Sequence, residues 1–456
     1  MAGSSAASCA ALLVAALLAV TSGEAGAQPD PPRATLALVG GTLIDGNAGP
    51  PIRNSVVLVD GDRVVAVGTV GSLAVPAGAE VISTEGMSVL PGLWDAHVHL
   101  MIVGHSDYGH WDATYPDRFR DEIMPAAARQ LLMAGVTSAR DAGGPLDDIL
   151  SVRDRINRGE LPGPTLYVSG PFIQHAPYPG TEAFRWGVDG QDDARSKVRR
   201  LADAGVDFIK LIDQDEMTVE EVRAVVDEAH ARGLKVVAHS HRPEEIRRGL
   251  AAGVDDFEHT GLSTSPEYPP DIMDAIRERT ARMNLGPLFW TPTAEVLYNY
   301  PATAANPEKL DDPCWTEGLG ADVIADIRQS LAHYDRLPYY QLSPARAPTL
   351  RRKVEQLRNA GVVLLIGTDS GVPGSFHCQS TWNELDVWVN HFGIPAHEAI
   401  RAATYWPAVF HDVADEVGTI EPGKVADIIA VRGDVLRHIA LLSDVDIIVK
   451  SGKRVK

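Results

Sequence analysis

The pattern of hydrophobic and polar positions divides the chain into two kinds of segment. Between residues 34 and 88, short β-rich runs such as Thr35 to Val39 and Ser55 to Val59 are separated by Gly, Asp and Pro turns. Short β-rich runs return near the end of the chain, at Val417–Ile420, Ala426–Val431 and Ile447–Lys450. From residue 89 to about residue 411, apolar strand-like runs alternate with helix-length segments, and this alternation predicts an α/β fold.

The alternating region contains eight strand candidates, and several of its helical segments end in Gly directly before the next strand. Eight strands that alternate with helices predict a (β/α)8 TIM barrel. The candidates are Leu93–His99, Val136–Asp141, Thr165–Ser169, Phe208–Ile212, Val236–His239, Asp256–His259, Leu288–Thr291 and Val362–Asp369.

The two β-rich ends are each too small to bury a core alone. We therefore expect residues 34–88 and 412–456 to form one small β-sandwich domain beside a barrel of residues 89–411. Residues 295–347 read as an insertion between the seventh and eighth strands, with one helical run near Val323–Tyr334. Long insertions after barrel strands lie over the active face and often act as lids, although a surface decoration is the alternative.

Residues 1–27 resemble a secretory signal peptide. The apolar run from Cys9 to Val20 is too short to span a bilayer, and it precedes the small-x-small pattern Ala25-Gly-Ala27. The absence of Lys and Arg before this run departs from the usual pattern, and a buried helix is the alternative. We expect cleavage near Ala27 and a secreted or periplasmic protein, whose remaining cysteines, Cys314 and Cys378, are free to pair.

The formal net charge of −20 argues against nucleic acids and anionic membranes as partners. No segment after the signal is long and apolar enough to cross a membrane. A small molecule or a peptide is therefore the expected partner, and a homo-oligomer stays open.

The candidate chemistry begins at the end of the first barrel strand. His97 and His99 share one face of this strand because side chains alternate across it. Two imidazoles on one strand face can hold a metal ion. A second His-x-His pair, His239 and His241, ends the fifth strand.

Other strand ends carry compatible groups. His259 ends the sixth strand, and Asp369 ends the eighth in a Gly-flanked turn, where a carboxylate can bind a metal and move a proton. A turn Asp without a catalytic role is the alternative. Active sites of barrels lie at these carboxyl ends of the strands, so the set predicts one metal centre. We expect His241, two residues beyond His239, to lie behind the ligands or to face the substrate.

Lys210 lies in the fourth strand, where an unpaired buried ammonium is costly, and more so beside two cations. Reaction of its amine with CO₂ would give an anionic carbamate that bridges two metal ions. An ion pair with a carboxylate such as Asp141 is the alternative.

Together these motifs resemble the amidohydrolase superfamily. The resemblance covers about residues 35–456 and includes Gly135-Val-Thr-Ser-Ala-Arg-Asp141, Leu365-Ile-Gly-Thr-Asp-Ser-Gly371 and Gly418-Thr-Ile-Glu-Pro-Gly-Lys-Val-Ala-Asp427. The lysine in Phe-Ile-Lys210 is similar to that of the branch of metal-dependent dipeptidases and carboxypeptidases related to prolidase.

The resemblance implies a role for each metal-binding residue. His97 and His99 would bind the more buried of two divalent ions with Asp369, and His239 and His259 would bind the outer ion. Carbamylated Lys210 would bridge the two ions, with a hydroxide between them. Zinc is the expected metal.

The sequence says less about the substrate. His175 and Tyr178 in the loop after the third strand, His241, and His377 after the eighth strand are candidates to grip a carboxylate or an oxyanion, and so is Arg185. Each is equally compatible with ordinary loop polarity.

The expected activity is hydrolysis of an amide bond in a small peptide or an N-acyl amino acid. A lactonase, arylesterase or phosphotriesterase with the same machinery is the first alternative. A scaffold without catalytic activity is the second, but it would need none of the metal-binding residues.

Overall fold

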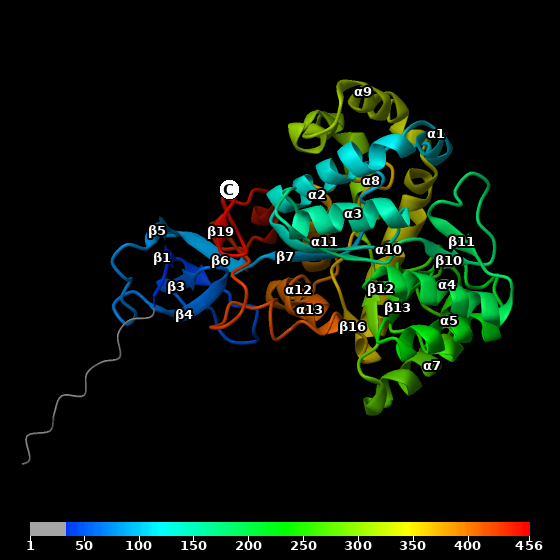
Figure 1. The fold of residues 1–456 in the computed structure, drawn as a ribbon, viewed down its shortest axis with the longest axis horizontal. Coiled ribbons are helices and arrows are strands. Elements are labelled where there is room, and N and C mark those ends of the chain that lie inside the picture. The colour runs from blue at the N-terminus through cyan, green and yellow to red at the C-terminus, as the bar shows by residue number, and fades with distance from the viewer. Residues whose placement is uncertain (1–32) are drawn as a thin grey trace, which may run out of the picture.

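The computed structural model describes residues 33–456, so the predicted signal segment of residues 1–27 lies outside the described residues (Figure 1). None of the described helices is long and apolar enough to cross a membrane. Within this part of the chain the molecule consists of a large α/β body and two small β-sheets at one end of it (Figure 1).

Two parallel sheets form the centre of the α/β body. One has the order β7-β8-β9, and the other has the order β11-β10-β12-β13-β14-β15-β16. The strands are β7 (Leu93–Val98), β8 (Val136–Asp141), β9 (Thr165–Val168), β10 (Phe172–Gln174), β11 (Arg185–Gly187), β12 (Phe208–Leu211), β13 (Lys235–His239), β14 (Asp256–Glu258), β15 (Phe289–Thr291) and β16 (Val363–Leu364).

Backbone hydrogen bonds join the two parallel sheets at both edges. Asp207 N donates to Val168 O over 2.8 Å, which links β12 to β9. On the other side Ala96 N donates to Ile366 O over 2.8 Å, and Val98 forms a parallel bridge with Ser370. The predicted α/β fold is therefore confirmed, and the arrangement is consistent with a TIM barrel.

Helices surround these sheets. The sequence encodes their ends: Thr218 and Glu221 form a capping box at the start of α5, and Gly205 and Gly253 end α4 and α6 in the left-handed conformation. The helices are α2 (Met124–Met133), α3 (Leu146–Asn157), α4 (Gly190–Ala204), α5 (Val219–Ala231), α6 (Pro243–Ala252), α7 (Pro270–Ala281), α11 (Ser380–Asp386), α12 (Ala396–Ala402) and α13 (Tyr405–Phe410), together with the short turns η1 (Pro116–Arg118), η2 (Phe119–Ile123), η3 (Met283–Leu285) and η7 (Val387–His391).

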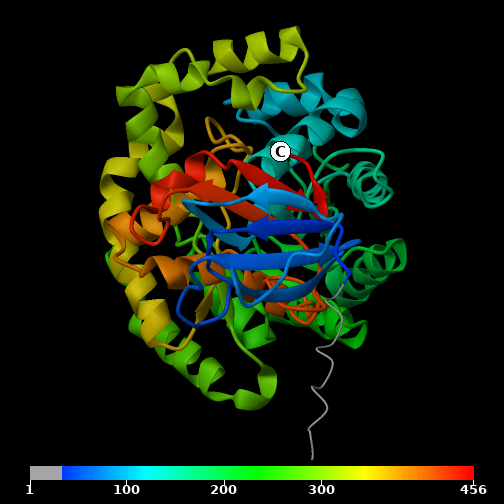
Figure 2. The same cartoon turned by 90° about the vertical axis from the view of Figure 1, so that its left-hand side faces the viewer.

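The two ends of the chain meet in the small sheets (Figure 2). The C-terminal strand β17 pairs antiparallel with β6, from Ile428 opposite Pro91 to Arg432 opposite Met87, and strands of both small sheets share one hydrophobic cluster. One sheet has the order β4-β3-β1-β5 and the other the order β19-β18-β17-β6-β2. Their strands are β1 (Leu36–Val39), β2 (Thr42–Leu43), β3 (Ser55–Asp60), β4 (Arg63–Thr69), β5 (Glu80–Ser83), β6 (Met87–Pro91), β17 (Ile428–Arg432), β18 (Ile447–Lys450) and β19 (Lys453–Arg454), and η8 (Ile439–Ser443) lies between β17 and β18.

The prediction of a strand at Val417–Ile420 was wrong. The structure has no strand there, because Gly418 takes a φ of 93° and turns the chain, although Ile420 N still donates to Asp45 O over 2.8 Å.

The segment after β15 is more helical than predicted. In place of one helical run near 323–334, it contains α8 (Glu295–Ala305), α9 (Ala321–Ser330) and the start of α10 (Pro338–Asn359), with η4 (Pro307–Asp311), η5 (Pro313–Thr316) and η6 (Tyr334–Arg336) between them. Proline at several helix starts and inside α8 and α10 obscures the helical pattern in the sequence.

A disulfide between Cys314 and Cys378 ties this segment to the loop after β16. Another short helix, α1 (Tyr108–Thr114), follows β7 and lies near α9 (Figure 1). The insertion and the segment after β7 thus lie at the same end of the parallel sheets.

Gly367 provides a test of how tightly the parallel sheets close. A Cβ atom there would lie 2.4 Å from Thr291 Cγ2 and 2.8 Å from the backbone nitrogen of His97. We expect Gly367→Ala to lower the free energy of unfolding by about 1–3 kcal/mol, measured by chemical denaturation, because backbone atoms cannot move aside easily. Gly49→Ala is the control, since its Cβ would meet open space. Equal unfolding midpoints for the two variants would contradict a tight closure at this point.

Candidate metal centre and active site

Three predicted residues meet where β7 and the segment after β16 lie side by side. His97 Nε2 lies 3.3 Å from His99 Nε2, and Asp369 Oδ1 lies 3.3 Å from the first nitrogen and 3.2 Å from the second. Ligands about 2.0–2.1 Å from one tetrahedral ion stand about 3.3 Å apart. The three atoms therefore have the spacing of ligands on a shared metal ion.

The orientation of His97 depends on a buried acid. His97 Nδ1 lies 2.5 Å from Glu258 Oε2, and Glu258 Oε1 in turn accepts a hydrogen bond from Arg140 over 2.6 Å. Burial by itself raises the pKa of the Glu258 carboxyl, but the nearby His97 and Arg140 outweigh burial and hold this pKa well below its usual range. The ionised Glu258 directs the His97 Nε2 lone pair towards His99 and Asp369.

A second group consists of His239, His241 and His259, whose ligand atoms all lie within 4.8 Å of one another. His239 Nδ1, His241 Nδ1 and His259 Nε2 are buried and have no hydrogen-bond partner among residues 33–456. His259 Nδ1 pairs with Thr293 Oγ1 at 2.7 Å, which leaves the other ring nitrogen free to bind an ion. Burial lowers the pKa of all three imidazoles, so they are neutral at pH 7, as ligands must be.

His241 lies closer to this group than predicted. Its ring stacks on that of His259 with 4.3 Å between the centroids. The geometry therefore offers three imidazoles on this side, and not only the His239 and His259 pair that the sequence suggested.

Lys210 lies near both groups and is fully buried, with an Nζ atom that has no hydrogen-bond partner in the described chain. Burial lowers its pKa to about 8. The alternative ion pair with Asp141 is not formed, because Asp141 accepts hydrogen bonds from the backbone nitrogens of Leu100 and Gly143. An unpaired buried amine among imidazoles is unfavourable unless another group is bound there or the amine is modified.

The backbone is constrained where two of these residues stand. His259 has a φ of 73° and Asp369 a φ of 62°, in the left-handed region that residues other than glycine seldom occupy. Such conformations cost of order 1–3 kcal/mol and are concentrated at functional sites. His259 directly follows β14, whereas the strand predicted to run to Asp369 ends at Leu364, so that Asp369 lies in the segment after β16.

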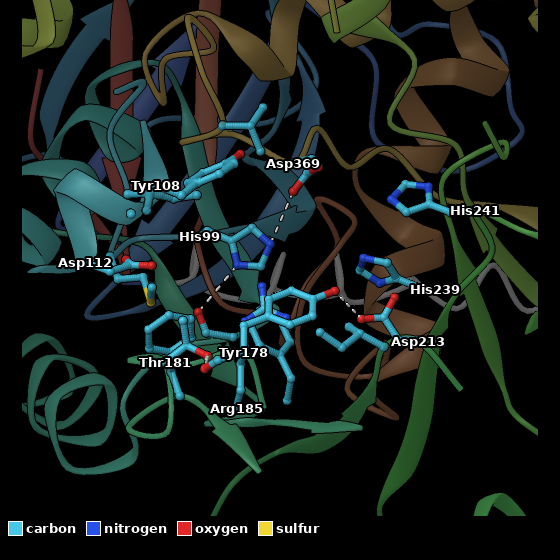
Figure 3. Close-up of a pocket in the computed structure, with 18 of the residues that line it drawn as sticks. His99, Tyr108, Asp112, Tyr178, Thr181, Arg185, Asp213, His239, His241 and Asp369 are labelled. Carbon is cyan, nitrogen blue, oxygen red and sulfur yellow. Dashed lines mark hydrogen bonds and ion pairs between the residues drawn. The ribbon is translucent and has the colours of Figure 1, made fainter. Parts of the chain in front are cut away.

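A cavity of about 480 Å³ opens above the two groups (Figure 3). His99, His239, His241 and Asp369 line it on the metal side. Its walls come from the segment after β7, from β10 and β11 with the loop between them, from the loop after β12 and from the insertion, and include Tyr108, Asp112, Phe172, Tyr178, Thr181, Arg185, Asp213 and Tyr339.

Two polar atoms in this wall lack hydrogen-bond partners, although Arg185 Nη1 donates to Gln174 Oε1 over 3.1 Å. Arg185 Nε and Asp112 Oδ1 are both buried without a hydrogen bond in the described chain. The Arg185 guanidinium lies 4.5 Å from the centre of the Tyr178 ring and 5.1 Å from that of Phe172, which fixes its position. The cavity therefore presents a cation and an acid to a ligand.

The predicted substrate-binding residues divide into those that line the cavity, which include Arg185, and those that do not. Tyr178 and His241 line the cavity, and the Tyr178 hydroxyl donates to Asp213 Oδ2 over 2.7 Å. His175 does not line the cavity. It directly follows β10, where the alternation of side chains turns it out to solvent. His377 is fully buried behind the site, with Nε2 3.2 Å from the backbone oxygen of His99.

Sequence reasoning missed several residues of this site, including Glu258, Tyr108, Tyr339 and Asp112. Glu258 was detectable, because Asp256 and Glu258 share one face of a buried strand and must find cationic partners. Tyr108 and Tyr339 gave no signal, since they lie on α1 and α10, far from the strand ends in sequence.

The loop that carries Asp369 rests on a buried acid from the insertion. Ser375 Oγ donates to Glu295 Oε1 over 2.6 Å, and the backbone nitrogen of Gly371 donates to Ser375 O over 3.1 Å. Burial raises the pKa of Glu295 from its ordinary 4.5 to about 8. Glu295 is therefore protonated at neutral pH and couples α8 to the loop of Asp369.

The parallel α/β sheets and a cluster of His, Asp and Lys at the carboxyl ends of their strands are typical of hydrolases built on barrels. The chain belongs to the amidohydrolase family, whose model matches residues 88–455. It is a hydrolase that acts on carbon–nitrogen bonds, and divalent metals are general in this family.

Individual relatives are similar over most of their length. Ochratoxinase of Aspergillus niger is 25% identical, with 89% of this chain and 82% of the relative covered. Imidazolonepropionase of Mesorhizobium japonicum is 25% identical, with 85% and 88% covered. A solved prolidase, complexed with N-methylphosphonate-L-proline, is 25% identical with a TM-score of 0.71, and the match covers 92% of this chain and 99% of that one.

The raised pKa of Glu295 predicts a pH dependence of stability. Because the pKa of Glu295 is higher in the folded protein than in the unfolded chain, its contribution to the free energy of unfolding is complete below about pH 4.5. This contribution is lost as the pH rises to about 8. We expect the free energy of unfolding of the wild type to fall, relative to that of Glu295→Gln, between these two values. Denaturation curves at several pH values measure this difference in the free energy of unfolding. Glu80→Gln, at an exposed position, is the control and should show the same pH dependence as the wild type. Parallel curves for the wild type and Glu295→Gln between pH 5 and 8 would contradict the buried neutral acid.

Proposed function

We propose that the protein is a secreted, binuclear metal-dependent amidohydrolase that hydrolyses an amide bond of a small peptide or N-acyl amino acid. The observation that carries the proposal is the position of the unpaired Lys210 near two groups of ligand-competent side chains at the floor of a cavity. In this proposal Lys210 is carbamylated, and the protein includes a small β-sandwich built from both chain ends.

The side chains fit two divalent ions, for which zinc is the expected metal. His97, His99 and Asp369 would hold one ion, and their mutual distances of 3.2–3.3 Å support this. His239 and His259 would hold the other, with His241 beside them and the Lys210 carbamate between the ions. When bound, two such ions supply a nucleophile from water at neutral pH and polarise the scissile carbonyl.

The remaining chemistry belongs to residues of the chain. Asp369 faces the cavity, where its carboxylate is placed to take a proton from the attacking water and to pass it to the leaving amine. His97 is kept in orientation by Glu258, and through it by Arg140. The insertion and the α1 segment cover the site and limit its access to water.

The unpaired atoms in the wall, Arg185 Nε and Asp112 Oδ1, support a substrate with a free carboxylate. Arg185 Nε and a second guanidinium nitrogen can donate to a substrate carboxylate in the bidentate manner that guanidinium groups favour. Asp112 is suited to a substrate nitrogen, such as the amine of a dipeptide. Both contacts would be used by a substrate in which the amide bond to be hydrolysed lies next to a free carboxylate.

Lys210→Ala tests the proposed bridge. We expect the variant to retain fewer divalent ions per chain, measured by elemental analysis, and to lose at least about 100-fold in kcat on dipeptides and N-acyl amino acids. A short-chain carboxylic acid added to the buffer should restore part of the activity by replacing the carbamate.

The control for loss of a buried lysine is Lys353→Met, because Lys353 is also buried but its Nζ donates to Ser263 O outside the cavity. Full metal content and full activity in Lys210→Ala would exclude the bridging role. If the protein hydrolysed lactones or aryl esters but no amides, the proposed amide substrate would be wrong and the activity would be that of a lactonase or arylesterase.

Arg185→Met tests the substrate class. Loss of a charge-assisted hydrogen bond costs about 1.5–3 kcal/mol, which corresponds to about 10–100-fold in kcat/KM. We expect this loss, mainly as a higher KM, for substrates with a free carboxylate, and little change for the matched C-terminal amides. Arg200→Met is the control, since Arg200 stacks on Trp186 outside the cavity. An equal loss for acids and amides would refute carboxylate recognition.

A further inference from the structure

A separate group of metal-compatible side chains lies between the segment after β7 and helix α9 of the insertion. His105 belongs to that segment, His110 to α1 and Asp326 to α9, and one ligand atom of each lies within 4.8 Å of the others. None of the three lines the cavity above the predicted catalytic metals.

The distances within this group suit a tetrahedral ion. Asp326 Oδ2 lies 2.8 Å from His110 Nε2 and 3.6 Å from His105 Nε2. These values bracket the separation of about 3.3 Å expected for two ligands on one zinc ion. Small side-chain movements would therefore bring all three atoms into the positions of ligands.

His105 gives the second, independent indication of a ligand. Its side chain is only 4% exposed, and Nε2 is buried without a hydrogen-bond partner in the part of the chain that the structure describes, although it points at the group. A buried ring nitrogen without a partner is rare and calls for a ligand. A bound cation would satisfy it.

The other ring nitrogen of His105 is compatible with this role. Nδ1 lies 3.0 Å from both the carbonyl oxygen and the backbone nitrogen of Asp107. When Nδ1 carries the proton and donates to the carbonyl, Nε2 presents its lone pair to the group, as in most histidine–metal sites. The opposite tautomer would leave Nε2 with a proton 3.6 Å from Asp326, too far for a good hydrogen bond.

The rest of the group supports an open, pre-oriented site. The Tyr115 hydroxyl donates to Asp326 Oδ2 over 2.8 Å and fixes the carboxylate. His110 has 46% of its side chain exposed, which leaves room for an ion to enter and for a water ligand. Ser106 already joins the same segment to α9 through Ser330, by hydrogen bonds of 3.1 and 2.7 Å.

We propose that His105, His110 and Asp326 form a third divalent-metal site, of the zinc class, that fastens α1 to the insertion. Two imidazoles, one carboxylate and a water suit zinc. Because α1 also carries Tyr108 and Asp112, the ion holds a wall of the cavity in place. This site does not depend on the proposed reaction or on the predicted catalytic metals.

Zinc binding by the full chain tests the proposal. After equilibrium dialysis against buffered Zn²⁺, elemental analysis should find one ion more per wild-type chain than per chain of His110→Gln or Asp326→Asn. His333→Gln is the matched control, because His333 is an exposed histidine of the same insertion outside the group, and it should retain the wild-type number.

Thermal unfolding supplies a readout besides metal content. Added Zn²⁺ should raise the unfolding temperature of the wild type and of His333→Gln more than that of His110→Gln. His110 is half exposed, so His110→Gln should fold even if Asp326→Asn does not. Equal zinc content and an equal zinc-induced shift in the wild type and His110→Gln would overturn the proposal, whether or not the protein hydrolyses amides.

Discussion

The buried chain of charges from Arg140 through Glu258 to His97 is the interaction on which the site depends. Arg140 is fully buried on β8 and also contacts Asp256 Oδ2 at 2.5 Å, so one guanidinium joins two acids of β14. Removing one partner of such a buried pair costs about 3–5 kcal/mol, because the remaining charge stays in a medium of low dielectric. The network therefore fixes the positions of β7, β8 and β14 relative to one another, and with them the imidazole of His97.

Several groups at the carboxyl ends of the strands are left without partners. Within the described chain, Lys210 Nζ, His239 Nδ1 and His259 Nε2 are buried and unpaired, whereas both carboxylate oxygens of Glu258, one layer below, are paired with His97 and Arg140. Unpaired buried polar atoms are destabilising, so their concentration at one point marks a place where a ligand completes the structure. The left-handed backbone of His259 and Asp369 adds to the local cost. The paired charges of Arg140 and Glu258 stabilise the fold, whereas the unpaired groups and the left-handed residues beside the cavity destabilise it.

The insertion gives the cavity its shape and contributes to its support. Tyr339 of α10 lines the cavity, and Glu295 of α8 holds the loop that carries Asp369. The disulfide between Cys314 and Cys378 ties the insertion to that loop by a covalent bond. These links make the insertion part of the site, so it is more than a surface decoration.

The sequence by itself determined the α/β fold and the positions of the polar residues at the strand ends. Side-chain alternation and the glycines after helices depend on local geometry, which is why His97, His99, Lys210 and Asp369 could be named from the pattern. Only the tertiary structure decided what surrounds them. The pairing of His97 with Glu258 and the position of His241 follow from contacts between segments far apart in the chain, and side-chain periodicity carries no information about such contacts.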